Sequence, residues 1–217
     1  MLRPIQSEEH AITRAGARAR RRWGPTDGGL PATGQTTCWD SFSDPIPCAG
    51  TGHDGDTHTG AALAYVDNGD GTITDVNTGL MWEKNSSNDG SVHDILNAYT
   101  WDQAFSVHVA TLNSTSFAGH ADWRLPNVKE LASIVNYENS NPAVSPAFAT
   151  TNCFSPSTCT VLTCSCTSVN QYWSSSTDFN FPNTSPAEVW IVDFSDGKVL
   201  GDFTTDQQNA RAVRGGS

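Results

Sequence analysis

Six cysteines are the residues of this sequence with the most direct chemistry. They form an N-terminal pair and a C-terminal cluster of four: Cys38, Cys48, Cys153, Cys159, Cys164 and Cys166. The even number, and a cluster rich in Ser and Thr but poor in charge, predict disulfides that pin irregular segments in an oxidising compartment. Spacings within the cluster differ from the paired CxxC of zinc ribbons, and no histidine follows residue 120. A soft-metal site is therefore the less favoured alternative, and the disulfide pairing stays open.

Two polar strings contain groups that bind metal ions. Residues 52–60 read GHDGDTHTG, with two His and two Asp close together, but Gly and Thr spacers give no fixed ligand geometry and favour a solvated loop. The NGDG string at 68–71 resembles part of a calcium loop, yet the first ligand position would fall on Val66, which is not a ligand. We therefore predict no metal site and no cofactor, with calcium as the alternative.

The string around residue 123 invites a catalytic interpretation, because His120, Asp122 and Arg124 are close together. No nucleophile, base and orienting group accompany them, which favours a structural role. We expect Trp123 and Leu125 in the core, and Arg124 paired with a carboxylate that locks the turn.

Local patterns predict the elements that must position these residues. Apolar residues alternate on both sides of residues 68–71, which predicts a hairpin, and NTGLMWEK predicts a further short strand. Two helices follow. We expect the first to begin at an N-cap on Thr100, and the second at Asn127 with Glu130 in a capping box.

The end of the chain is predicted to be strand-rich. Residues 139–170 show no clear period, which predicts a long cross-linked loop. The strings QYWSSS, EVWIVDF, KVLGDF and ARAVRGG follow as strands. In EVWIVDF we expect Trp190, Val192 and Phe194 to face the core. Helices in the first half and strands at the end predict an α+β fold with an antiparallel sheet.

The length of the chain and the distribution of its charge limit the number of domains and the kinds of partner. The chain has 217 residues, of which 37% are hydrophobic and 16% charged, and this suits one domain. No apolar run approaches the roughly 20 residues that span a bilayer, so we expect no transmembrane segment. Residues 1–22 carry six basic and two acidic residues (net +4), whereas the remainder carries six basic and 21 acidic (net −15). We predict a disordered basic tail over 1–29 and no nucleic-acid partner for the acidic body.

Several strings occur in an order that resembles a known family. These are DNGDGTITDVNTGLMWEK, TWDQAF, GHADWRLPNVKEL, QYWSSS, FSDG and RAVRGG. Together they are similar to the C-terminal domain family of the Legionella collagen-like adhesin, over about residues 61–217. The resemblance implies a C-type-lectin-like fold of the formylglycine-generating-enzyme subtype, with two helices and antiparallel strands. It also implies display outside the cell and carbohydrate binding. Residues 30–60, around Cys38 and Cys48, are then an irregular lead segment.

The final strands also resemble the variable proteins of diversity-generating retroelements. Such proteins keep a framework like WSSS…W…F…G…RAVRGG and change the exposed positions between. The resemblance implies a ligand-binding set at the intervening positions here: Asp178, Phe179, Asn180, Asn183, Glu188, Asp193, Lys198, Leu200, Asp202, Asp206, Gln207 and Gln208. Exposed aromatic, amide and acidic groups on strands suit a rigid binding surface.

Three functional hypotheses follow. The favoured one is a non-catalytic extracellular binding module, on a cell surface or virion, for a cell-surface glycan or protein, with a homo-oligomer such as a trimer adding avidity. The second is a formylglycine-generating-enzyme-like oxidoreductase that uses Cys164 or Cys166, although their Ser and Thr neighbours offer no positive charge to activate a thiol. The third is a structural component of a surface fibre or virion.

Overall fold

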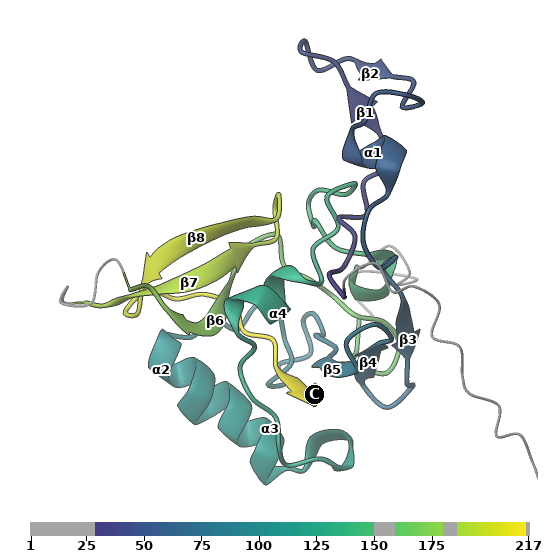
Figure 1. The fold of residues 1–217 in the computed structure, drawn as a ribbon. Helices are drawn as coiled ribbons and strands as arrows, with labels where there is room; N and C mark the ends of the chain where they lie inside the picture. Colours follow the sequence, from purple (N-terminus) through teal and green to yellow (C-terminus); the bar gives the residue numbers. More distant parts are fainter. Residues whose placement is uncertain (1–28, 150–158, 180–185, 216–217) are drawn as a thin grey trace, which may run out of the picture.

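The computed structural model describes residues 29–149, 159–179 and 186–215. Nearly all of the predicted basic tail, residues 1–28, lies outside the described residues. The elements are few helices and three antiparallel sheets, so the predicted α+β class is confirmed (Figure 1).

The first large sheet contains the predicted hairpin. Its strands are β3 (Tyr65–Asp67), β4 (Thr72–Asp75), β5 (Leu80–Glu83) and β9 (Val213–Gly215), in the order β3-β4-β5-β9. β3 and β4 are antiparallel across the NGDG turn, as predicted. β9 pairs with β5 although about 130 residues of chain separate them, so the end of the chain returns to the opening hairpin.

The second large sheet holds the other closing strands. β6 (Gln171–Thr177), β7 (Glu188–Asp193) and β8 (Lys198–Phe203) run antiparallel in the order β6-β7-β8. The turn between β7 and β8 requires glycine, because Gly197 has φ +83° and a Cβ there would lie 2.5 Å from Val135 Cγ1. β8 is an edge strand, and its side chains are mostly exposed.

A long helix covers one face of this sheet (Figure 1). It comprises α2 (Trp101–Gln103), the π-helical turn η1 (Ala104–Val109) and α3 (Ala110–Ser114). Thr100 is its N-cap, as predicted, and Gln103 completes a capping box. The π-helical turn was not predicted, and it contains the buried His108.

A short second helix, α4 (Val128–Ala132), packs against β6 and β7. The Asn127 side chain accepts hydrogen bonds from the backbone N–H groups of Lys129 and Glu130, and the Glu130 carboxylate accepts one from the Asn127 N–H. This confirms the predicted capping box. Two short 3₁₀ turns, η2 (Phe117–Gly119) and η3 (Pro146–Phe148), follow the long helix and α4 along the chain.

The string around residue 123 has the predicted structural role. Trp123 and Leu125 are buried. Both terminal nitrogens of Arg124 donate to the Glu130 carboxylate at 2.7 Å, so the guanidinium locks the turn that leads into α4. Asp122 makes a corresponding pair with Arg214 on β9.

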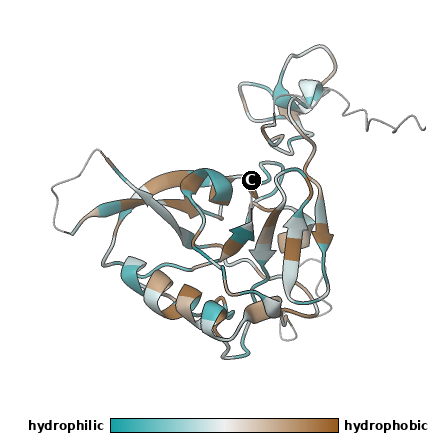
Figure 2. Ribbon diagram, turned by 60° about the horizontal axis from the view of Figure 1, so that its bottom comes forward, coloured by the Kyte–Doolittle hydropathy of each residue, from teal (hydrophilic) through white to brown (hydrophobic). Residues whose placement is uncertain are grey.

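Two large hydrophobic clusters form most of the core of the described residues, and β7 contributes to both of them. Val189 and Ile191 pack beneath the sheet with Trp173, whereas Val192 and Phe194 pack on the opposite side. Our expectation of one core face, with Trp190 inside it, is therefore wrong. β7 is the central strand with cover on both faces, so Val189, Ile191 and Val192 are buried although they differ in parity, whereas Trp190 is only half-buried. Figure 2 shows hydrophobic residues along the strands and the long helix.

The lead segment projects from the body (Figure 1). It contains β1 (Cys38–Trp39) paired with β2 (Pro45–Ile46), followed by the four-residue helix α1 (Asp54–Thr57). A disulfide joins Cys38 and Cys48, whose Cα atoms are 5.2 Å apart. The segment is thus more regular than predicted, because this short cross-link closes a small hairpin.

A disulfide also staples the long loop. Cys159 is bonded to Cys166, and Cys164 is disulfide-bonded as well. The Cys166 N–H donates to the carbonyl of Asn85 at 2.8 Å, which fixes the staple to the end of β5. The prediction of disulfides in this cluster is confirmed.

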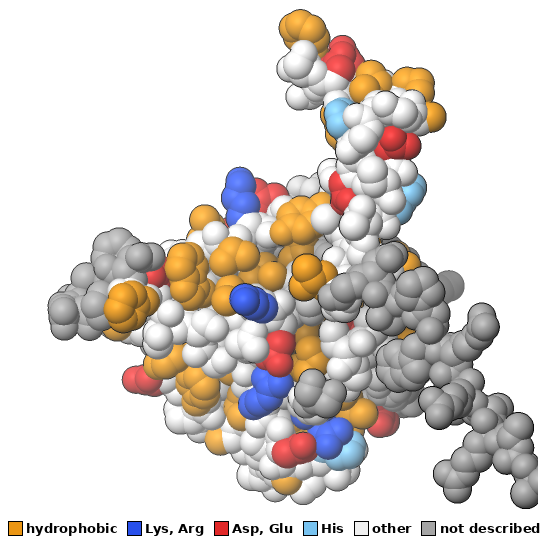
Figure 3. All heavy atoms as spheres, in the orientation of Figure 1, with side chains coloured by type: hydrophobic (Ala, Val, Ile, Leu, Met, Phe, Trp, Pro, Cys, Tyr) orange, Lys and Arg blue, Asp and Glu red, His pale blue; other side chains and the backbone are white. Residues whose placement is uncertain are grey.

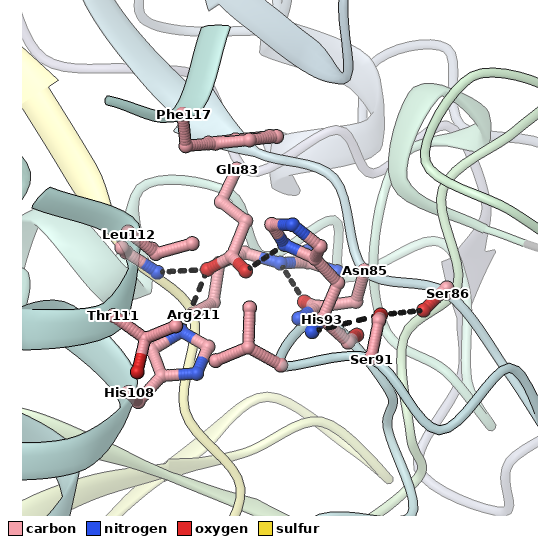
Figure 4. A network of polar contacts seen from close by, with 12 residues as sticks. Glu83, Asn85, Ser86, Ser91, His93, His108, Thr111, Leu112, Phe117 and Arg211 are labelled. Carbon is pink, nitrogen blue, oxygen red and sulfur yellow. Dashed lines mark hydrogen bonds and ion pairs between the residues drawn. The ribbon is translucent and has the colours of Figure 1, made fainter. Parts of the chain in front are cut away.

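A buried carboxylate connects the elements at the centre of the molecule (Figure 4). Glu83 ends β5 and has no exposed side-chain surface. It accepts hydrogen bonds from the backbone N–H of Ala212 at 2.8 Å, from His108 Nε2 at 2.8 Å and from His93 Nδ1 at 2.6 Å. Burial by itself raises the pKa of Glu83, but the charges and hydrogen bonds of the two histidines outweigh it and lower the pKa to about 2.

A buried guanidinium lies beside this carboxylate. Arg211 Nε donates to Asn85 Oδ1 at 2.6 Å, and Nη2 donates to the Cys166 carbonyl at 2.6 Å and to Thr167 Oγ1 at 3.0 Å. Its guanidinium carbon also lies 5.3 Å from the ring centroid of Phe148. One arginine therefore joins the approach to β9, the end of β5 and the stapled loop.

We predict that Glu83→Gln destabilises the protein in a pH-dependent manner. The folded-state pKa lies below the ordinary 4.5, so the carboxylate stabilises the fold above about pH 4.5. This contribution, on the order of 3 kcal/mol, is lost as the pH falls from about 4.5 towards about 2. Urea unfolding between pH 7 and pH 2 measures the gap in unfolding free energy between the wild type and the variant.

The gap should be widest at neutral pH and should close towards pH 2. Asp196→Asn is the control, because Asp196 is exposed and pairs only with the exposed Lys198, so it should change stability little. A gap that stays constant across the pH range would contradict a stabilising ionised Glu83.

Candidate functional site

The predicted ligand-binding residues fall into three groups. Asn180 and Asn183 lie outside the described residues. Three others flank the connection from β6 to β7, namely Asp178, Phe179 and Glu188. The remaining seven lie on β7, on β8 and in the segment after β8: Asp193, Lys198, Leu200, Asp202, Asp206, Gln207 and Gln208.

Strand register determines which of these side chains share a face. Leu200 pairs with Ile191, and Asp202 pairs with Val189. The side chains of Leu200 and Asp202 therefore lie on the same face of the sheet as the buried side chains of Ile191 and Val189. Lys198 has the same parity on β8. Lys198, Leu200 and Asp202 therefore form one row along the edge strand, which we call the β8 row.

A polar hollow of about 430 Å³ lies next to this row. Predicted residues Asp193, Gln207 and Gln208 line it, together with Asn170 and Gln171. Gln171 pairs with Asp193 across β6 and β7, so two rigid strands form one wall. The hollow offers carboxylate and amide groups that both donate and accept hydrogen bonds, which suits a polar ligand.

A carboxyl pair connects the β8 row to the hollow. Gln208 Nε2 donates to Asp202 Oδ2 at 2.6 Å. The hydrogen bond between the side chains of Asp206 and Asp202, with smaller effects of burial and charge, raises the pKa of Asp206. Five predicted residues are thus linked along one surface. Asp193, Gln207 and Gln208 line the hollow, and Gln208 connects it to the pair of Asp202 and Asp206.

Two predicted residues do not join this surface. Asp178 is only 6% exposed, so the expectation of exposure is wrong for it. Its backbone N–H donates to the Glu188 carbonyl at 3.1 Å, which draws the end of β6 against β7. Glu188 pairs with Phe203, and its side chain therefore points to the face opposite the β8 row. Phe179, by contrast, is 86% exposed.

Sequence analysis missed an apolar strip on that opposite face. Val199 and Phe203 on β8 are each 42% exposed, and the half-buried Trp190 lies between them on β7. Figure 3 shows hydrophobic side chains gathered over this part of the sheet. The alternation within KVLGDF was the available signal, because every second residue from Val199 shares this face.

The polar strings considered for metals serve the local backbone. Asp56 Oδ2 accepts from the N–H groups of Gly50 and Gly52, both at 3.0 Å. In the NGDG hairpin, Asp67 binds Lys84 Nζ at 2.8 Å, and Asp70 accepts from Thr72. These hydrogen bonds and this ion pair hold the loop around Gly50–Gly52 and the turn of the hairpin in place.

The cysteine cluster brings three sulfur atoms together. The sulfurs of Cys159, Cys164 and Cys166 lie within 4.8 Å of one another, and all three residues are buried and disulfide-bonded. A sulfur in a disulfide is neither a thiolate nucleophile nor a thiolate metal ligand. Disulfides are characteristic of oxidising compartments, which is consistent with an extracellular protein.

We predict that Asp206 titrates above the ordinary aspartate pKa of about 3.9, because the side-chain hydrogen bond to Asp202 favours its protonated form. In ¹³C NMR titrations of the side-chain carboxyl groups, Asp202→Asn should move this pKa back down. Asp193→Asn is the control and should leave it in place. An Asp206 pKa at or below the ordinary value in the wild type would show that the pair does not form in solution.

Comparison with known proteins identifies the family. Among the described residues, no helix is both long and apolar enough to cross a membrane. A search of curated proteins found no match. Residues 71–214, about two thirds of the chain, match the family described as the Lcl C-terminal domain, which is associated with a Legionella adhesin. This span contains both large sheets except β3 and the end of β9, and it includes every predicted ligand-binding residue. The chain therefore belongs to the Lcl C-terminal domain family.

Proposed function

We propose that this protein is a non-catalytic extracellular binding module, displayed on a cell surface or virion, that recognises its ligand through the β8 row and the adjoining hollow. The observation that carries the proposal is that five predicted residues lie along one surface of a rigid sheet, where Gln208 links the hollow to the pair of Asp202 and Asp206. Family membership supports a surface-binding role.

The arrangement separates recognition from folding. The β8 row lies on an edge strand with mostly exposed side chains, whereas the neighbouring strand β7 is buried on both faces. Substitutions in the row therefore remove few core contacts. This separation is what a diversified surface requires, so we include diversification by a retroelement in the proposal. A near-copy of the coding sequence for these strands beside a reverse-transcriptase gene would support it.

We further propose that the fold is C-type-lectin-like, of the formylglycine-generating-enzyme subtype. The two helices, the antiparallel strands and the disulfide-stapled loop support this assignment. The corresponding oxidoreductase activity would need an accessible thiol, and both Cys164 and Cys166 are buried in disulfides. Their state supports binding without catalysis.

Charge constrains the proposed ligand. The chain has a formal net charge of −11, and the proposed surface carries Asp193, Asp202 and Asp206. The nearby Lys198 pairs with Asp196 at 2.5 Å. The negative electrostatic potential of this surface disfavours sulfated glycans and favours a neutral glycan or a basic protein surface. A homo-oligomer, such as a trimer, would strengthen weak single sites through avidity.

A matched pair of variants tests the proposed surface. Leu200 and Val199 are neighbours on β8 with similar exposure, 39% and 42%, but they point to opposite faces. Leu200→Arg should weaken binding about tenfold or more, because it places a large charged group in the β8 row. Val199→Arg should retain binding. The intact protein is assayed on a glycan array and on biotinylated cell-surface proteins, with thermal melting to verify folding.

Loss of binding in Val199→Arg, with Leu200→Arg unaffected, would move recognition to the apolar strip and overturn the proposal. Absence of binding to every glycan and surface protein would overturn it as well.

A further inference from the structure

A second cavity lies away from the β8 row, where the lead segment joins the body. Its volume is about 500 Å³, within the range of small-molecule sites. Thr33 and Asp54 of the lead segment line one side, together with Ala62 just after it. Tyr65 and Asn136 line the other. We call this space the neck cavity. One of its walls precedes the family-matched span, which begins at residue 71.

Hydrogen bonds between the lead segment and the body preform this cavity. The Glu138 carboxylate accepts from the N–H groups of Thr36 and Thr37, at 2.7 and 3.0 Å. The Tyr137 N–H donates to the Thr33 carbonyl at 2.9 Å. Gly34 packs so closely on the Asn136 side chain that a Cβ would lie 2.4 Å from its Oδ1. The walls therefore need no rearrangement to accept a ligand.

The charged side chains that line the neck cavity indicate which class of ligand it could bind. Its only carboxylate is Asp54, and no Lys or Arg lines the described cavity. Thr33 Oγ1 donates to Asp54 Oδ2, while the second oxygen, Oδ1, accepts no hydrogen bond among the described residues. A carboxylate oxygen is thus left available beside an apolar wall that includes Tyr65 and Pro146. An anion would meet no Lys or Arg there, and His58 is the only basic side chain in the lining.

We propose that the neck cavity binds a small organic cation of the primary or quaternary amine class, with the Asp54 carboxylate as its counter-charge. The alkyl part of such a ligand packs on the apolar wall and the aromatic ring of Tyr65. For a primary amine, the amide oxygen of Asn136 and the hydroxyl oxygen of Thr33 can accept the remaining ammonium hydrogens, whereas a quaternary amine relies on its charge and its apolar contacts. The same chemistry is offered by a free amine and by the lysine side chain of a peptide.

This site is independent of the proposed recognition surface. It shares no lining residue with the hollow beside the β8 row. A failure of amine binding would leave the proposed function untouched, and Leu200→Arg should not affect the neck cavity.

The test uses the full 217-residue chain with cadaverine, choline and a capped Gly-Lys-Gly tripeptide as probes, and glucose and acetate as comparators. Saturation-transfer NMR detects binding, and calorimetry measures the dissociation constants. We expect an amine or the tripeptide to bind, with affinity that falls as salt is raised. Tighter binding of the tripeptide assigns the ligand to a peptide, and tighter binding of cadaverine or choline assigns it to a free amine.

Two variants locate the site. Asp54→Asn keeps an oxygen for Thr33 but removes the charge, and it should weaken binding about tenfold. Ala62→Trp fills the cavity from an exposed position and should abolish binding. Ala110→Trp, at an exposed position on α3, is the matched control and should bind as the wild type does.

The proposal is overturned if neither the amines nor the tripeptide bind, if glucose or acetate binds equally well, or if Asp54→Asn leaves affinity unchanged. Thermal melting verifies that each variant is folded. If Ala62→Trp does not fold, the affinity of Asp54→Asn alone tests whether amines bind in the neck cavity.

Discussion

The buried carboxylate of Glu83 is the interaction on which the rest of the structure depends. It binds two histidines and a backbone N–H that come from three separate stretches of chain. An ionised group without exposed surface is strongly destabilising when it lacks partners, so these stretches must meet correctly for the fold to form. Glu83 therefore fixes β5, the long helix and the approach to β9 relative to one another.

Because the centre of the molecule is fixed in this way, the side chains of the edge strand β8 can be substituted without loss of the fold. Arg211 and the Cys159–Cys166 staple extend the fixed region into the long loop. β7 packs against both clusters and is hydrogen-bonded along its length to β8, so β7 holds the backbone of β8 in place. β8 needs only its backbone pairing to β7, so its side chains are left to face solvent and a ligand.

Local signals made part of this fold predictable. The NGDG hairpin and the N-caps at Thr100 and Asn127 each involve residues close together in sequence, and each prediction is confirmed. The Glu83 and Arg211 contacts span more than 100 residues to their farthest partners and have no local signature. Burial of Asp178 and of both faces of β7 likewise depends on which strands become neighbours. The predicted ligand-binding positions came from resemblance, and strand register then divided them between two faces.

The central claim is that folding and recognition use different residues of the same strands. A saturation-mutagenesis library of the full chain, displayed on yeast and sorted separately for protease resistance and for binding to the ligand-bearing surface, tests it most directly. Substitutions in the β8 row and at Gln207 should alter binding while protease resistance persists, whereas substitutions at Glu83 and Arg211 should abolish both. Binding that followed protease resistance at every position would contradict this separation, because the β8 row would then be part of the folding scaffold.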